Sequence, residues 1–118
     1  MKTLVIGASE NPDRYANQAV RLLDEYKHEI VAVGLREGII GNIPIQAGQP
    51  AFDEVDTVSL YVGPQRQDDL VDYVIGLRPR RVIFNPGTEN PAFEAKLQAA
   101  GIEPLEACTL VMLRTAQW

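Results

Sequence analysis

Residues 2–9 constrain this chain more than any other segment, because they combine an apolar strand pattern with a glycine turn. Residues 4–6 form a short continuous apolar run, which is typical of a strand buried on both faces of a parallel sheet. Gly7 ends this run, and Ala8 and Ser9 lead into a segment with helical spacing. In parallel sheets such a corner holds phosphate, since free backbone N–H groups and the positive end of a helix meet there. We therefore predict an α/β fold with a phosphate-binding corner at Gly7, Ala8 and Ser9.

Strand and helix patterns alternate along the whole chain. Strands are predicted at residues 3–6, 30–33, 57–62, 81–84 and 102–106. Helices are predicted at about residues 11–26, 65–77, 91–100 and 108–113, the first starting at Asn11-Pro12 or one turn later. Residues 35–52 are predicted to form a long loop with one extended piece near Ile39 and Ile40. This alternation indicates right-handed parallel βαβ units in an α/β fold, with the ligand beyond the carboxyl ends of the strands.

Size and charge limit the classes of function. A chain of 118 residues is long enough for a single core, so one domain over residues 1–118 is predicted. The 11 basic and 16 acidic residues give a net charge of −5, which argues against a nucleic-acid partner and gives no attraction to an anionic membrane. The single cysteine, Cys108, excludes an internal disulfide. The first apolar run is too short for a signal peptide or a membrane span, and a cytoplasmic location is expected.

The first loop departs from the dinucleotide fingerprint G-x-G-x-x-G. Gly7 occupies the first position, Ser9 replaces the second glycine, and no third glycine follows. A serine still lets the backbone approach a phosphate and adds a hydroxyl donor. The alternative is a turn glycine with a helix-capping serine and no ligand. Arg14, followed by Tyr15, lies where its guanidinium closes over a diphosphate, or else it is an ordinary surface arginine.

The residues at the end of the second strand indicate which kind of nucleotide ribose the site would recognise. Enzymes that select NAD place an acidic residue there, whereas this chain has Gly34, then Leu35 and Arg36. A guanidinium at this position suits a ribose that carries a phosphate, as in NADP or coenzyme A. The alternative is a solvated arginine in a loop. The remaining candidate binding residues lie at the carboxyl ends of the third and fourth strands: Tyr61, Gly63, Pro64, Asn85, Pro86 and Gly87.

Motifs typical of a known family lie in four segments, residues 7–15, 27–31, 81–90 and 106–113. In combination they resemble the small stand-alone coenzyme-A-binding proteins, and the resemblance covers nearly the whole chain apart from residues 35–52. These proteins are similar in fold to the N-terminal CoA-binding domain of the succinyl-CoA synthetase α subunit. The resemblance implies a Rossmann-like, doubly wound sheet of about five parallel strands that binds CoA through its first loop. The glycine-rich first loop of the synthetase domain is largely lost here.

Candidates for catalysis are few. His28, the only histidine, is expected in the turn before the second strand, on the edge opposite the binding loops. Cys108 follows the last strand, and without a neighbouring histidine or second cysteine it is interpreted as an inert buried thiol. Glu89 either orients a ligand or interacts with the dipole of the third helix. No spacing of Cys, His and Asp indicates a metal site.

Three classes of function remain open. The first is a non-catalytic module that binds coenzyme A or an acyl-CoA as a carrier, sensor or partner subunit. The second is a protein that binds NADP or another phosphorylated nucleotide. The third is an interaction protein that has kept the fold and lost the ligand. The apolar tail, residues 110–118, is expected to supply part of a homodimer or partner surface.

Overall fold

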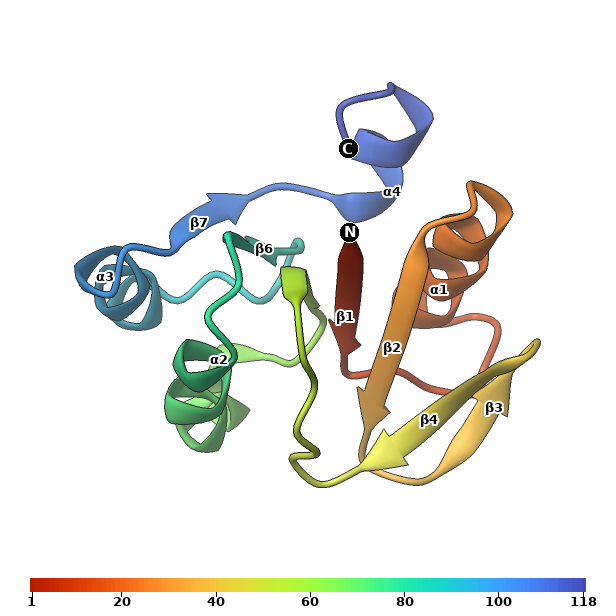
Figure 1. Cartoon of the computed structure of the whole chain (residues 1–118), viewed down its shortest axis with the longest axis horizontal. Helices are drawn as coiled ribbons and strands as arrows, with labels where there is room; N and C mark the ends of the chain where they lie inside the picture. The colour runs from red at the N-terminus through yellow and green to blue at the C-terminus, as the bar shows by residue number, and fades with distance from the viewer.

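A computed structural model describes residues 1–118 as one seven-stranded sheet with helices on both faces (Figure 1). The strands are β1 (Lys2–Ile6), β2 (Glu29–Gly34), β3 (Gly38–Ile40), β4 (Ile43–Ala47), β5 (Val55–Leu60), β6 (Arg81–Phe84) and β7 (Glu103–Glu106). The helices are α1 (Tyr15–Glu25), α2 (Val71–Leu77), α3 (Pro91–Ala99) and α4 (Thr109–Arg114), with 3₁₀ turns η1 (Pro64–Arg66) and η2 (Asp68–Leu70) before α2. None of these helices is long and apolar enough to cross a membrane.

The order of the strands is β3-β4-β2-β1-β5-β6-β7. All neighbouring strands are parallel except β3, which pairs antiparallel with β4. The chain leaves β1 toward β2 on one side and later returns to place β5 on the other side. The order therefore reverses between β1 and β5, and ligands of open α/β sheets bind at such a reversal.

Two apolar layers cover the sheet, as expected for a doubly wound fold. One layer joins α2 and α3 to the sheet through Val74, Phe93 and Leu97, which are almost fully buried. The other joins α1 and α4 to the opposite face through residues such as Val20 and Leu113. In Figure 1, α2 and α3 lie to the left of β1 and α1 lies to the right. The fully buried runs in β1 and β6 explain why these strands read as continuous apolar segments.

The predicted fold class is confirmed, with one correction in residues 35–52. The five predicted strands correspond, in chain order, to β1, β2, β5, β6 and β7. The segment predicted as a loop contains the β3–β4 hairpin. Gly41 and Asn42 form its turn, with Gly41 at a φ of +59° and Ile40 paired with Ile43. Glycine tolerates this left-handed backbone, so the turn closes without strain. Pro44 is accommodated in a short strand near the edge of the sheet.

The helix boundaries also differ from the sequence pattern. The first helix begins at Tyr15, which agrees with the alternative start one turn after Pro12. Residues 64–70 form two 3₁₀ turns, so the second helix is shorter than the predicted range 65–77. The third helix begins as predicted, because the Asn90 side chain accepts a hydrogen bond from the Phe93 N–H at its N-terminus.

The C-terminal tail packs onto the protein's own sheet. Leu110 and Leu113 are buried, and Val111 is the large apolar side chain of α4 that stays exposed. Trp118 lies 4.6 Å from the Arg81 guanidinium, measured to the ring centre, and edge-on to His28. His28 therefore lies at the amino-terminal edge of the sheet, as predicted. Most of the apolar side chains of the tail therefore pack within the protein. Self-association through the tail stays a prediction.

Candidate functional site

The loops after β1, β2 and β5 meet at the reversal of the strand order. Gly7 has a φ of +96°, and a Cβ built on it would lie 3.0 Å from the backbone C and O of Tyr61. A Cβ on Gly34 would clash with the carbonyl oxygen of Ala8. Both glycines are therefore required by close backbone contacts. The structure brings these predicted residues together at the carboxyl edge of β1, β2 and β5.

The first loop is held by its own hydrogen bonds. The N–H groups of Gly7 and Ala8 both donate to the Val33 carbonyl, each at 2.9 Å. The Ser9 hydroxyl oxygen accepts the Asn11 N–H at 3.1 Å, and the buried Asn17 amide donates to the Ser9 carbonyl at 2.8 Å. The amides of Gly7 and Ala8 are thus occupied, contrary to the expectation that they are free for phosphate. These two residues shape the corner rather than supply its donors.

The free donors lie one turn later, at the start of α1. This helix begins without a side-chain cap and has no acidic residue in its first turn. Its first N–H groups have no hydrogen-bond partner within the protein and lie at the positive end of the helix dipole. Ala16 and Asn17 are buried, so the N–H of the exposed Tyr15 is the one most open to an anion. Arg14 occupies the N-cap position, and Tyr15 follows it with 69% of its surface exposed. Neither side chain makes a hydrogen bond or ion pair within the protein. Both predicted residues thus lie beside the uncapped helix end.

Arg36 lies in the exposed segment between β2 and β3. Its guanidinium makes no ion pair or hydrogen bond in the protein, and the neighbouring Leu35 is 87% exposed. The segment is joined to the first loop through Glu10, whose carboxylate accepts the Ile39 N–H at 3.0 Å. Sequence reasoning did not identify Glu10, because a lone loop glutamate carries no pattern. Arg36 stays a candidate for a phosphate on the ribose.

Asn85 forms the centre of a buried polar network at the end of β6. Its amide donates to the Ser59 hydroxyl and to the Leu60 carbonyl, each at 3.0 Å, and its oxygen accepts the Thr109 N–H at 2.8 Å. The Ser59 and Thr109 hydroxyls are themselves 2.8 Å apart. All the hydrogen-bonding groups of this side chain are occupied, so we interpret predicted site residue Asn85 as a support for the edge.

The Tyr61 hydroxyl is buried beside this network. It makes no hydrogen bond of normal geometry, although the Thr109 and Ser59 hydroxyls lie nearby. Burial raises the pKa of Tyr61 to about 12, and the two hydroxyls oppose that rise. Tyr61 is therefore protonated at neutral pH and cannot serve there as a general base. Cys108, which is half-buried and unpaired, lies near the same hydroxyl.

Gln67 ties together the loops after β5 and β6, a role that sequence reasoning missed. Its side chain is fully buried and donates to the carbonyls of Val62 at 2.7 Å and Thr88 at 2.8 Å. Its oxygen accepts a hydrogen bond from the Asn90 side chain at 2.9 Å. A glutamine in a polar segment is usually solvated, and only the fold shows that this one is buried. It fixes the spacing between the two loops.

The other predicted residues lie in these two loops. Gly63 and Pro64 begin η1, where Gly63 packs against the side chain of Gln65. Pro86 and Gly87 are exposed, and the Gly87 N–H donates to the Glu89 carboxylate at 2.9 Å. Glu89 therefore stabilises its own turn. Their role in ligand binding stays a prediction, because no contact in the structure tests it.

Acidic side chains gather near the ends of β6 and β7. The Glu94 carboxylate accepts the Asn90 N–H at 3.1 Å, while burial and the nearby Glu106 carboxyl raise the pKa of Glu94. The charge of Glu89 acts in the same direction. The carboxyl edge thus has acidic side chains at this end, while its other end carries Arg14 and Arg36 together with Glu10, Asp13 and Glu37.

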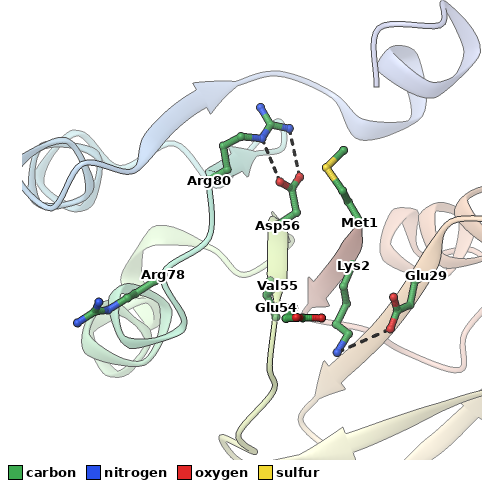
Figure 2. Close-up of a pocket in the computed structure, with 8 residues that line it drawn as sticks. All are labelled: Met1, Lys2, Glu29, Glu54, Val55, Asp56, Arg78 and Arg80. Atoms are coloured by element: carbon green, nitrogen blue, oxygen red, sulfur yellow. Dashed lines mark hydrogen bonds and ion pairs between the residues drawn. The ribbon is translucent and has the colours of Figure 1, made fainter.

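A separate depression of about 570 Å³ lies at the opposite, amino-terminal edge of the sheet (Figure 2). Its charged groups largely pair with one another: Arg80 binds Asp56 through two hydrogen bonds, and Lys2 lies 3.7 Å from Glu29. The hydrogen bond from Arg80 lowers the pKa of Asp56. Because four of the six charged side chains that line it are already paired, the uncapped start of α1 is the better candidate for an anionic ligand.

The strand order and the reversal between β1 and β5 define a Rossmann-like α/β domain. A family model described as a CoA binding domain matches residues 1–114. This chain belongs to that CoA-binding domain family.

Solved structures share this fold. An uncharacterized protein is 44% identical, with a TM-score of 0.96 over 99% of this chain and 97% of that chain. A protein from Thermus thermophilus is 24% identical, with a TM-score of 0.86 over 99% of this chain and 90% of that one. A dinucleotide-forming acetyl-coenzyme A synthetase of Ca. Korarchaeum cryptofilum is 16% identical, with a TM-score of 0.76 over 90% of this chain and 25% of that chain, which shows a shared fold. No curated protein matches this chain.

Proposed function

We propose that this protein binds coenzyme A or an acyl-CoA at the carboxyl edge of its sheet, without catalysing a reaction. The observation that carries the proposal is the uncapped start of α1 beside the reversal of the strand order, with Arg14 at its N-cap. Membership of the CoA-binding domain family supports coenzyme A as the ligand. In this arrangement the diphosphate lies over the first turn of α1, within reach of the Arg14 guanidinium and the Ser9 hydroxyl.

The two unpaired arginines orient the ligand. The phosphate groups of coenzyme A belong at the end of the edge that carries Arg14 and Arg36, where Arg36 pairs with the phosphate on the ribose. The uncharged pantetheine arm then extends past Tyr61 toward the loops after β5 and β6. NADP is the second candidate, because Arg36 replaces the acidic residue that NAD-selecting sites use and would equally suit a phosphate on its ribose.

The non-catalytic role is supported by the chemistry at this edge. Tyr61 is protonated at neutral pH, and His28 lies at the opposite edge beside Trp118. Cys108 therefore has no histidine to activate its thiol. A bound CoA would be held and presented to another protein, which suits a carrier, a sensor or a partner subunit.

Arg14→Ala is expected to weaken CoA binding by about 1–3 kcal/mol, the range for losing a charge-assisted hydrogen bond. The fold should be unaffected, because the exposed Arg14 side chain makes no hydrogen bond or ion pair within the protein. Titration calorimetry measures the affinity, and thermal denaturation with CoA or NADP shows which ligand stabilises the fold. Arg114→Ala, which removes an exposed arginine from the end of α4, is the matched control. Unchanged affinity in Arg14→Ala would remove this residue from the site, and no thermal shift with either ligand would contradict the proposed function.

Acyl-CoA thioesters should remain intact when incubated with the purified protein, since no activated nucleophile lies at this edge. Release of free CoA can be followed with a thiol reagent, with the spontaneous hydrolysis rate as reference. Turnover above that rate that disappears in Cys108→Ser would contradict the non-catalytic proposal and would make Cys108 a nucleophile.

A further inference from the structure

We propose that Glu10 is a positioning residue that fixes Arg36 for recognition of the ribose phosphate. This inference rests on the proposed function and extends it to specificity. Glu10 lies in the first loop, while Arg36 lies at the base of the β3–β4 hairpin. The Glu10 carboxylate joins the two by accepting the Ile39 N–H at 3.0 Å.

The Glu10 end of this link is rigid. The Ser9 hydroxyl oxygen accepts the Asn11 N–H, and the Asn11 side chain accepts the Asp13 N–H at 3.0 Å. The Ser9 carbonyl is bound by the buried Asn17 side chain. Residues on both sides of Glu10 are therefore held, and its carboxylate extends from a fixed backbone.

The hairpin end is shaped to receive that carboxylate. A Cβ built on Gly38 would lie 2.6 Å from Cδ and 2.8 Å from Cγ of Glu10, so the glycine makes room for this side chain. The hairpin otherwise joins the sheet through β4, which pairs with β2 over only three residues, Ala32 to Gly34. Side chains of residues 35–37 make no hydrogen bond. Glu10 is thus the side-chain link between the first loop and the segment that carries Arg36.

The charge of Glu10 allows the positioning role to be separated from a purely electrostatic one. A carboxylate beside an anion-binding corner opposes phosphate by simple repulsion. If Glu10 acted only through its charge, its removal would tighten CoA at least as much as dephospho-CoA, because CoA carries the additional phosphate, and the preference for CoA would be kept or increased. If it positions Arg36, its removal reduces the preference for CoA over dephospho-CoA, and a neutral acceptor in its place preserves that preference.

The test compares the affinities of CoA and dephospho-CoA in the full chain. The wild type is expected to prefer CoA, Arg36→Ala to lose most of that preference, and Glu10→Ala to reduce it roughly three- to tenfold, the range for losing one exposed hydrogen bond. Glu10→Gln should keep the wild-type ratio, since its amide oxygen can still accept the Ile39 N–H. Glu37→Ala, which removes a carboxylate from the same segment without removing a hydrogen bond, is the matched control. Adding Glu10→Ala to Arg36→Ala should change the ratio no further.

Hydrogen exchange of the Ile39 amide gives a second readout without ligand. It should be faster in Glu10→Ala and close to wild type in Glu10→Gln. A wild-type ratio in Glu10→Ala, or a wild type that binds both ligands equally, overturns the inference while leaving CoA binding in place. Failure of the wild type to bind either ligand contradicts the proposed function itself.

Discussion

Gly7→Ala is expected to lower the free energy of unfolding by about 3–4 kcal/mol, because it combines backbone strain with a clash. At a φ of +96° an L-residue is strained, and the added Cβ would lie 3.0 Å from the Tyr61 backbone. The Tyr61 N–H donates to the Ile6 carbonyl at 2.8 Å, so neither chain can move away without breaking the ladder between β1 and β5. Urea denaturation followed by circular dichroism measures the loss.

Gly87→Ala is the matched control for this prediction. Gly87 has a φ of +93°, yet a Cβ built on it meets nothing within 4 Å. Its substitution should cost only the strain, about 1–2 kcal/mol. The difference between the two variants isolates the contact between Gly7 and Tyr61. Equal destabilisation would show that this contact contributes nothing beyond the backbone conformation.

Asn85→Ala should destabilise the protein by about 3–4 kcal/mol, since it leaves several buried polar groups without partners. The Thr109 N–H, the Leu60 carbonyl and the Ser59 hydroxyl each lose a hydrogen bond to this side chain. The start of α4 is expected to loosen most, because Asn85 binds its first N–H. Denaturation measures the overall effect, and hydrogen exchange of the Thr109 amide reports the local one.

The control is Asn42→Ala, at the exposed turn of the β3–β4 hairpin. Asn42 makes no side-chain hydrogen bond, and its substitution should change stability by less than about 0.5 kcal/mol. If Asn85→Ala were equally mild, the buried network would be dispensable. A water molecule in the space left by the Asn85 side chain would then explain the small effect, because it would bind the groups that lost their partner. Rates of hydrogen exchange at Ser59 and Leu60 would test this explanation.

The sequence predicted the parallel core of the sheet because burial on both faces produces unambiguous apolar runs, as in residues 4–6 and 82–84. The β3–β4 hairpin was missed although its signal is present. Gly41-Asn42 is a two-residue hairpin turn between isoleucines, but Pro44 and the surrounding Gly and Gln residues obscured the strand pattern. Short strands near a sheet edge carry few apolar residues, so they resemble loops.

The sequence predicted that the candidate residues would converge, but it did not predict their hydrogen bonds. Gly7, Gly34 and Tyr61 do meet at one edge, because the carboxyl ends of parallel strands must converge. Which amides stay free could not be read from the sequence, since the Val33 carbonyl that occupies the amides of Gly7 and Ala8 is 26 and 25 residues away along the chain. The burial of Gln67 likewise depends on tertiary packing, which leaves no local pattern.

The two outer strands determine whether the sheet can grow by joining another chain. At one edge, β7 contains Pro104, which has no N–H to offer, between the charged residues Glu103 and Glu106. At the other edge, β3 is only three residues long, and its Ile39 N–H is already bound by Glu10. Both margins therefore discourage strand addition, so this protein should resist edge-to-edge aggregation.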